Sequence, residues 1–472
     1  MQIAFDNSYA RLPERFYTKQ PPVAVRTPAL LAFNDMLAAD LGIRTADRDA
    51  LTEIAVGNRL PEGAEPLAQV YAGHQFGGFS PQLGDGRAIL LGEVVTESGR
   101  FDIQLKGSGR TPYSRMGDGR AWLGPVLREY VVSEAMASLG IPTSRALAAA
   151  TTGESVYREQ GALPGAVLTR VAASHVRVGT FQFFAARQDN EALQALFDYV
   201  VARHYPDAQD PIELLDAVIA GQAKLVAHWM SVGFIHGVMN TDNTTLSGET
   251  IDYGPCAFMD TYHPDTVYSS IDTHGRYAYA NQPRVLVWNM AQLATALLPL
   301  MPNQDDAVAA FTKSVHAMPE QIQRNWRQMF GEKIGIAAAA EEDDTLIGDL
   351  LNLMAEGRAD FTNTFRALSD PDGAPRDQFL ESKAFDVWFS RWQDRMATED
   401  TPHDRMSQVN PAFIPRNHRV EQMIAAAVAG DTAPFERLLA VLSRPFTAQP
   451  EARDLTYPPE VDEVVRQTFC GT

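Results

Sequence analysis

The spacing of apolar residues changes along the chain from the alternation of strands to the spacing of helices. Residues 88–95 form a predicted strand, and in residues 101–106 apolar and polar side chains alternate as they do in a half-buried strand. A further strand is predicted over 166–171. Because Lys106 falls on the polar side of its strand, its side chain is expected to point away from the apolar row. These strands predict a β-rich first part of the fold.

Helical patterns occur before, between and after these strands. Residues 28–41 contain the best helical pattern near the start of the chain, and a second helix is predicted over 125–140, with a proline in its first turn and a glycine at its end. A third helix over 210–233 begins with an Asp-Pro start signal. Residues 288–298 are apolar nearly all round, which predicts a buried helix, and the patterns stay helical to about residue 443.

The stretch from 236 to 255 carries polar residues that predict a metal site. Asn243 comes before, and Asp252 after, two short predicted strands over 244–246 and 250–251. A hairpin of this kind would bring the two side chains together, and their oxygens are the hard ligands that Mg²⁺ prefers alongside phosphate and water. Protein kinases build their metal site in this way, from a catalytic-loop Asn and a later Asp.

The comparison with kinases fails at one position. The kinase catalytic-loop Asn follows a His by seven positions, and His236 and Asn243 have this spacing. The position of the kinase base is taken by Val238, which cannot accept a proton. The nearby carboxylate is Asp242, directly before the Asn. The stretch therefore predicts a kinase-like metal site in which the chemistry around the nucleophile is rearranged.

Glycines gather just before the strand over 88–95, where kinases place a loop over the nucleotide phosphates. Gly84 and Gly86 flank an Asp and are followed by Arg87, whose planar guanidinium matches phosphate geometry. Such glycines mark ordinary turns more often than phosphate loops. A lone strand lysine is likewise usually solvated, but Lys106 lies where a phosphate-binding strand lysine would lie.

The tetrapeptide Gly-Asp-Gly-Arg occurs a second time, at 117–120. The repeat can be chance, but a second such turn, with Asp118 and Gly119, also suits a site that wraps a polyanion. Glu129, on the helix that follows, is the candidate ion-pair partner of Lys106, as in kinases. Plain solvation is the alternative for a single glutamate on a helix.

Two arginines lie within and after the strand over 166–171. Arg170 and Arg177 flank a Ser-His pair, and for each the alternative is a surface ion pair. In an acidic protein, a cluster of these two arginines with Arg87 near predicted strand ends indicates that an anion is bound.

Composition narrows the function classes. The chain has 472 residues, more than one ordinary domain, and a formal net charge of −19. This charge disfavours non-specific binding to nucleic acid or to anionic membranes, which require basic surfaces. No run approaches the roughly 20 apolar residues of a membrane span, the first residues show no signal pattern, and two cysteines make neither a disulfide framework nor a four-cysteine zinc site. We expect a cytoplasmic monomer that binds neither nucleic acid nor membrane.

Together the motifs resemble those of the selenoprotein O family of protein adenylyltransferases. The resemblance covers almost the whole chain and is highly specific. It is carried by Y-A-G-H-Q-F-G-G-F at 71–79, Q-L-G-D-G-R at 82–87, Q-L-K-G-S-G-R-T-P-Y-S-R at 104–115, H-G-V-M-N-T-D-N at 236–243, I-D-Y-G-P at 251–255 and the ending Q-T-F-C-G-T at 467–472.

The resemblance implies an α+β, protein-kinase-like fold with two lobes. Expected are an N-terminal extension over 1–60 that packs on the core, a β-rich N-lobe over 61–165, a helical C-lobe with the metal site over 166–400, and a helical C-terminal extension and tail over 401–472.

The resemblance also implies roles for the candidate residues. Asn243 and Asp252 would bind Mg²⁺ or Mn²⁺, and Asp242 would be the proton acceptor. ATP would lie inverted relative to kinases, with its α-phosphate facing the incoming hydroxyl, so that AMP passes to Ser, Thr or Tyr of protein substrates and pyrophosphate leaves. UMP transfer from UTP is an extension of this activity. The ATP site would consist of Gly84, Gly86, Arg87, Lys106, Asp118, Gly119, Glu129, Arg170 and Arg177, with Arg170 and Arg177 on the terminal phosphates.

Two other classes of function stay open from the residues. A phosphotransferase would use the same ATP site but transfer the γ-phosphoryl group, and an ATP-binding pseudokinase would bind nucleotide and transfer nothing.

The two cysteines suggest a redox element. Animal members of the family carry selenocysteine near the C-terminus, at a position that matches Cys470, and Cys256 directly follows the D-Y-G-P motif. The hypothesis is a reversible disulfide between Cys256 and Cys470 that restrains activity. The alternative is two unrelated thiols in a reducing cytosol.

Overall fold

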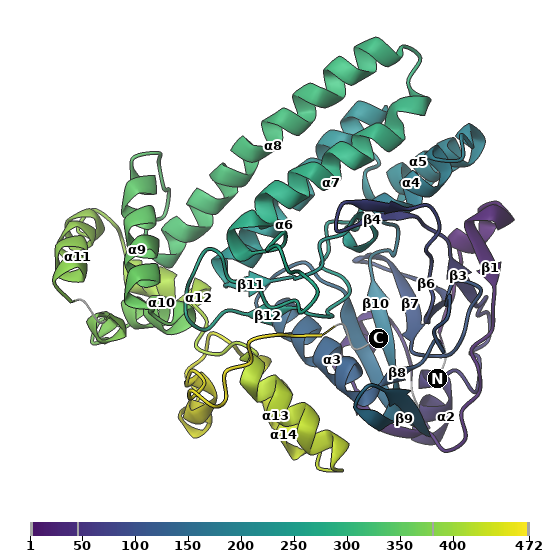
Figure 1. Cartoon of the computed structure of the whole chain (residues 1–472), viewed down its shortest axis with the longest axis horizontal. Coiled ribbons are helices and arrows are strands. Elements are labelled where there is room, and N and C mark those ends of the chain that lie inside the picture. The colour runs from purple at the N-terminus through teal and green to yellow at the C-terminus, as the bar shows by residue number, and fades with distance from the viewer. Residues whose placement is uncertain (1–2, 45–46, 380–381, 470–472) are drawn as a thin grey trace.

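The computed structural model describes residues 3–44, 47–379 and 382–469. Strands gather in the N-terminal part of the molecule and helices in the C-terminal part (Figure 1). This arrangement confirms the predicted α+β class.

The N-terminal part is built on one mostly antiparallel sheet with the strand order β1-β3-β6-β7-β10-β9-β2, to which β8 adds by pairing with β10. The strands predicted over 88–95, 101–106 and 166–171 lie inside this sheet, in β6, β7 and β10. Lys106 ends the central strand and stands opposite Ala88 on one side and Leu168 on the other. The strands are β1 (Tyr17–Lys19), β2 (Ala29–Phe33), β3 (Leu67–Gln69), β6 (Ala88–Thr96), β7 (Gly99–Lys106), β8 (Ala121–Trp122), β9 (Arg145–Arg158) and β10 (Gly161–Ala172).

The predicted helix over 28–41 is wrong in its first half. Residues 29–33 form β2, which pairs with β9 at the edge of the sheet. Helix α1 (Asp35–Asp40) begins only after Asn34, whose side chain accepts a hydrogen bond from the N–H of Leu37. The run A-L-L-A-F is short, and a short apolar run fits a strand as well as a helix until its neighbours are known. Residues 1–60 also contain β1, so they supply both edge strands of the sheet.

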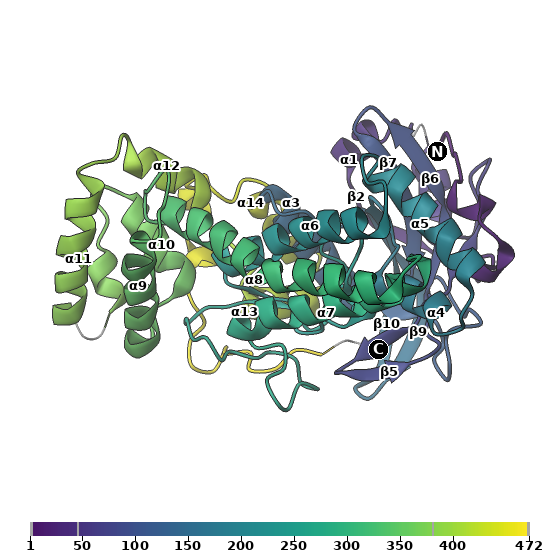
Figure 2. The same ribbon diagram turned by 90° about the horizontal axis from the view of Figure 1, so that it is seen from above.

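Three helices of the second part pack on one another. Helices α6, α7 and α8 lie against one another (Figures 1 and 2). The helices predicted over 125–140, 210–233 and 288–298 correspond to α3, α6 and α7. Within the described residues, none of the helices combines the length and apolar character needed to cross a bilayer. After α2 (Arg48–Ala55), the helices are α3 (Leu123–Ser138), α4 (Val178–Ala185), α5 (Asn190–His204), α6 (Pro211–Ser231), α7 (Gln282–Leu297), α8 (Gln304–Lys333), α9 (Asp343–Gly357), α10 (Phe361–Ser369), α11 (Ser382–Met396), α12 (Pro402–Val409), α13 (Asn417–Val428) and α14 (Ala433–Leu442).

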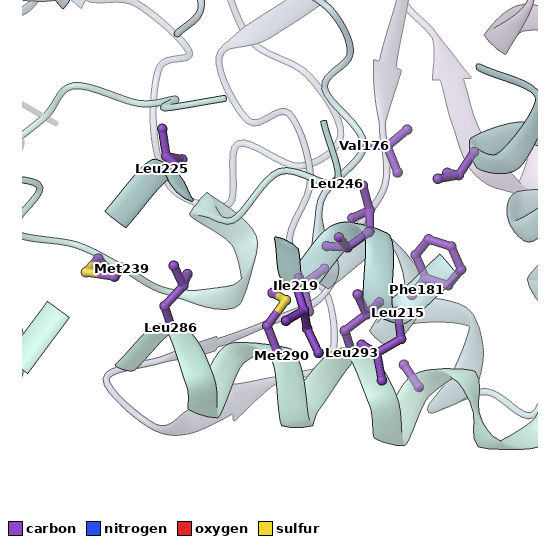
Figure 3. Close-up of a cluster of buried hydrophobic side chains, with 14 of the residues drawn as sticks. Val176, Phe181, Leu215, Ile219, Leu225, Met239, Leu246, Leu286, Met290 and Leu293 are labelled. Atoms are coloured by element: carbon purple, nitrogen blue, oxygen red, sulfur yellow. The ribbon is translucent and has the colours of Figure 1, made fainter. Parts of the chain in front are cut away.

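A buried apolar cluster anchors the polar stretch 236–255 to these helices. Figure 3 shows Met239 and Leu246 of this stretch among side chains of α6 and α7, such as Ile219 and Met290. All four are at most 2% exposed. Burying a side chain of this size stabilises the fold by about 1.5–3 kcal/mol. The apolar residues of the stretch therefore hold it against α6 and α7, while Asp252 contacts Lys106 at the end of β7.

The C-terminal helices cover the helix that carries Glu129. Helices α13 and α14 pack on α3, where the rings of Tyr130 and Phe435 meet edge to face at 5.6 Å. Arg128 donates a hydrogen bond to Asn417 at 3.0 Å. The C-terminal extension thus holds α3 from the side opposite the sheet.

Candidate active site

A pocket of about 470 Å³ lies at the junction of the sheet and the helical part, a size typical of sites for small ligands. Both Gly-Asp-Gly-Arg turns, the end of β7 and the stretch 236–255 contribute to its walls. The structure brings every residue predicted for ATP, metal or proton transfer into this lining. They are Gly84, Gly86, Arg87, Lys106, Asp118, Gly119, Glu129, Arg170, Arg177, Asp242, Asn243 and Asp252.

Three cations converge on one carboxylate in this pocket. Lys106 Nζ lies 2.6 Å from Glu129 Oε2 and 2.7 Å from Asp252 Oδ1. Arg170 Nη1 also lies 2.7 Å from Asp252 Oδ1, and 3.2 Å from Glu129 Oε1. Arg177 Nη1 lies 2.8 Å from Asp252 Oδ2. The Lys106–Glu129 ion pair predicted from the sequence is therefore present, and the arginines join it.

The three cations keep the carboxylate of Asp252 ionised. Burial would raise the pKa of Asp252, but the three cations outweigh that effect and hold its pKa well below the ordinary value. The side chains of Arg170 and Arg177 are only 1% and 3% exposed, whereas that of Asp252 is 20% exposed and lines the pocket. Buried arginines held in fixed positions by carboxylates are preorganised to receive phosphate oxygens.

Three residues hold the arginines in place, and the sequence interpretation did not identify them. Gln104 Oε1 accepts a hydrogen bond from Arg170 Nε at 3.2 Å, and the guanidinium of Arg177 stands 4.6 Å above the ring of Tyr71. Asp85 lies 3.9 Å from Arg177; burial raises the pKa of Asp85 to about 6, against the opposing effect of the arginine charge. The period of two in a strand could have identified Gln104, because it shares a face of β7 with Lys106.

The glycines of the two turns are required by close packing. A Cβ on Gly84, whose φ is +145°, would lie 2.5 Å from the ring of Tyr113, and one on Gly86 would lie 2.9 Å from the carbonyl oxygen of Tyr113. A Cβ on Gly119 would lie 2.2 Å from the carbonyl oxygen of Gly109. Only glycine permits these approaches, so both turns pack against the segment that follows β7.

Asp118 and Arg87 differ from the buried cluster in their surroundings. Asp118 is about half exposed and forms an ion pair with Arg158 at 2.8 Å, while its carboxylate also accepts from the N–H of Arg120. Arg87 lines the pocket next to the glycine turn, and its carbonyl oxygen accepts from the N–H of Gly107. Asp118 therefore lies at the rim of the pocket rather than with the Asp252 cluster.

A short hairpin, β4 (Gly73–Gln75) and β5 (Gly78–Ser80), holds the candidate proton acceptor. Gln75 Nε2 donates to Asp242 Oδ2 at 3.1 Å. The hairpin backbone makes two further bonds to the preceding residues, from the N–H of His74 to Thr241 Oγ1 at 2.7 Å and from the N–H of Phe76 to Asn240 Oδ1 at 3.1 Å.

The environment of Asp242 suits the acceptance of a proton. Burial raises its pKa to about 6, although the charge of Arg177 opposes the shift. Its Oδ1 atom is buried and has no hydrogen-bond partner within the part of the chain that the structure describes. A carboxylate with a raised pKa and an unused acceptor oxygen can take a proton from a hydroxyl placed beside it.

The predicted hairpin over 244–246 and 250–251 is wrong. Thr245 pairs with Arg177 and Thr250 pairs with Thr143, so the two segments pair with other parts of the chain and not with each other. The physical reason is that tertiary contacts outweigh local propensity in short β segments.

A buried histidine links the two ends of this stretch in place of the hairpin. His236 Nε2 lies 2.9 Å from the carbonyl oxygen of Ile251, and the N–H of Val238 lies 3.3 Å from His236 Nδ1. Burial lowers the pKa of His236, which favours the neutral ring. With this link in place of a hairpin, Asn243 and Asp252 both line the pocket.

Asn243 and Asp252 fit a divalent cation that also binds phosphate. Asn243 Nδ2 donates to the carbonyl oxygen of Val238 at 2.9 Å, which leaves the amide oxygen available to a ligand. Asp252 has φ +61°, a conformation that is uncommon for residues other than glycine and concentrates at functional sites. Among the described residues, His, Cys, Asp and Glu form no group of three that could hold a metal. The protein would therefore supply two hard oxygens, and phosphate and water the remainder, as is usual for Mg²⁺.

The structure describes only one of the two cysteines. Cys256 is buried, whereas Cys470 lies outside the described residues. The hydroxyl of Thr468 donates to the carbonyl oxygen of Pro255 at 2.6 Å, so the tail reaches the residue next to Cys256. The disulfide stays a prediction.

Comparisons with known proteins identify the family of this chain. The family model described as Protein adenylyltransferase SelO matches residues 1–443. The Protein nucleotidyltransferase YdiU of Ruegeria sp. (strain TM1040) is 63% identical over 473 residues and is matched over 100% of both chains. The protein of the same name from Roseobacter denitrificans (strain ATCC 33942 / OCh 114) is 64% identical, with 99% of both chains covered. The one from Rhodopseudomonas palustris (strain BisB18) is 56% identical, with 100% of both covered. Because the family model and these relatives match the chain along nearly its whole length, the resemblance predicted from the motifs is confirmed, and the chain belongs to the SelO family.

Proposed function

We propose that this protein has a kinase-like fold and transfers AMP from ATP to Ser, Thr or Tyr hydroxyls of protein substrates, releasing pyrophosphate. The observation that carries the proposal is the convergence of Lys106, Arg170 and Arg177 on Asp252 in a pocket of about 470 Å³. Three fixed cations exceed what a neutral ligand requires and match a triphosphate. Membership in a family described as protein adenylyltransferases supports the same assignment.

The depth of the cations supports an inverted orientation of ATP. Arg170 and Arg177 are the most buried of the three, so the terminal phosphates would lie at the closed end of the pocket. The α-phosphorus would then lie nearer the mouth of the pocket, with Asp242 in the adjoining wall. This inverted orientation also explains why position 238 can carry a valine instead of the kinase base, because the nucleophile approaches from elsewhere.

Transfer requires one bond to form and one to break. The substrate hydroxyl oxygen attacks the α-phosphorus, its proton passes to Asp242, and the bond between the α-phosphorus and the bridging oxygen of pyrophosphate breaks. Arg170 and Arg177 stabilise the negative charge that develops on the departing oxygens. A Mg²⁺ or Mn²⁺ ion held by Asn243 and Asp252 would add charge neutralisation.

Parallel incubations with α-labelled and γ-labelled ATP test the proposal on the full chain. Label is expected in protein substrates only from the α position, and Asp252→Ala is expected to abolish it because the cations lose their common anchor. Asp349→Ala, which removes an exposed carboxylate from an ion pair between α9 and α11, is the matched control. A third incubation with α-labelled UTP measures UMP transfer.

Each contrary outcome identifies a different activity. Label from the γ position would make the protein a phosphotransferase. Nucleotide binding without transfer from either position would make it a pseudokinase and overturn the proposal.

A further inference from the structure

A second cavity adjoins the active-site pocket. Its volume is about 450 Å³, and it lies between the segment 271–276 and the beginning of α7. Phe76 and Ile271 line both cavities, so the two share a wall. Both side chains are exposed, as expected of a rim that a macromolecule can reach.

The shared wall is tied to the candidate proton acceptor. Phe76 directly follows Gln75, which donates to Asp242, and the N–H of Phe76 donates to Asn240 Oδ1. The hydroxyl of Tyr277 donates to the same Asn240 atom at 2.6 Å, and the rings of Phe76 and Tyr277 lie 5.1 Å apart. A group bound in the second cavity would therefore lie beside the wall that carries the contacts of Asp242.

Positive charge dominates the second cavity, in contrast to the whole chain. Arg276 and Arg284 line it, and among the described residues no carboxylate forms an ion pair with either. Asp272 is the acidic residue of the lining, but its carboxylate is buried and accepts from the backbone N–H groups of Arg276 and Tyr277, at 2.9 and 2.7 Å. With a net charge of −19, the rest of the surface repels acidic partners, so this cavity is a local exception.

The two arginines differ in their surroundings. The guanidinium of Arg276 stands 4.9 Å above the ring of Trp288, which also lines the cavity, and this contact restrains it. Arg284 lies in the first turn of α7 and is exposed. A planar guanidinium can bind a carboxylate with two parallel hydrogen bonds, whereas an ammonium ligand would be repelled by both groups.

We propose that this cavity recognises an Asp or Glu of the protein substrate, a few residues from the hydroxyl that receives the nucleotide. The inference rests on the proposed function, because it assigns the substrate preference of the same reaction. It predicts that the protein selects hydroxyls in acidic sequence contexts, and that Arg276 and Arg284 determine this selection.

A peptide array measures the preference. Peptides with one central Ser, Thr or Tyr carry Asp, Glu, Ala or Lys at each flanking position, and incorporation from α-labelled ATP is compared. The wild type is expected to prefer Asp or Glu over Lys by about tenfold or more at one flanking position, a typical value for an ion pair that loses its partner. Arg284→Glu is expected to reverse the preference toward Lys at that position. Arg391→Glu, on the exposed face of α11, is the control and should keep the wild-type preference.

The outcomes separate the inference from the function on which it rests. Labelled peptides without a charge preference, or with a preference that Arg284→Glu leaves unchanged, would overturn the inference and leave adenylyl transfer intact. Absence of label from every peptide and every protein in the parallel incubations would overturn both. ATP affinity is expected to be equal in the wild type and Arg284→Glu, because Arg284 does not line the nucleotide pocket.

Discussion

Replacing Gly73 by alanine is expected to displace the carboxylate of the candidate proton acceptor, Asp242, whose backbone carbonyl oxygen accepts a hydrogen bond from Arg177 at 2.6 Å. A Cβ on Gly73 would lie 2.5 Å from Asp242 Oδ1 and 2.9 Å from Asp242 Cγ. Ordinary contacts of a Cβ begin at 3.4 Å, so the carboxylate or the strand must move by about 0.9 Å (3.4 − 2.5). The hydrogen bond from Gln75 restrains the carboxylate, and the strand is restrained by its pairing with β5.

The magnitude follows from that displacement. A misplacement of about 1 Å at a reacting group typically costs on the order of 100-fold in rate. We therefore expect Gly73→Ala to lower the rate of AMP transfer about 100-fold at saturating ATP. ATP affinity is expected to fall far less than the rate, because Lys106 and Arg170 keep their contacts with Asp252.

The assay compares transfer from α-labelled ATP with direct measurement of ATP binding. Gly78→Ala is the matched control, because it adds a methyl group to the same hairpin where the nearest atom, the carbonyl oxygen of Gln75, lies at an ordinary 3.5 Å. A Gly73→Ala variant that transfers AMP at the wild-type rate would refute the role of Asp242. An equal loss in Gly78→Ala would refute the specific clash and point to the hairpin as a whole.

Three further predictions concern other parts of the molecule. Asp242→Asn is expected to reduce AMP transfer by about 10²–10⁴-fold while ATP still binds, and wild-type activity in this variant would exclude Asp242 as the proton acceptor. Lys333 is fully buried, and burial lowers its pKa to about 7. Because the pKa of Lys333 is higher in the unfolded state, the cost of burying this side chain is largest below pH 7 and declines as the pH rises above 7. The free energy of unfolding of the wild type relative to Lys333→Met should therefore increase by about 3 kcal/mol from pH 6 to pH 9 in denaturant titrations. A difference that does not change with pH would contradict the lowered pKa. Mass mapping under non-reducing conditions after mild oxidation is expected to give a peptide linked through Cys256 and Cys470, and recovery of both thiols unmodified would end the redox hypothesis.

Much of the site could be predicted from the sequence because its chemistry is carried by local patterns. Alternation in 101–106 correctly placed Lys106 on a strand, and the spacing of His236 and Asn243 directed attention to a stretch that lines the pocket. Strand and helix periodicity also gave the α+β class. These signals extend over a few residues, so they survive without knowledge of the fold.

Short segments whose conformation depends on distant partners could not be predicted. Residues 29–33 became an edge strand because β9 was available to pair with them, and Thr245 and Thr250 paired with Arg177 and Thr143 instead of each other. Gln75 gave no signal of its own, since its role depends on a hairpin that is 167 positions from Asp242 in the sequence.

The sequence by itself determined which groups of this protein could bind phosphate and metal. The tertiary structure decided that Lys106, Arg170 and Arg177 share one carboxylate, that a hairpin fixes Asp242, and that a basic cavity adjoins it. The physical reason is that residue type and short-range spacing determine the chemistry of a group and its local conformation. The position and the protonation of a group are set by burial and by charges that long-range packing brings together.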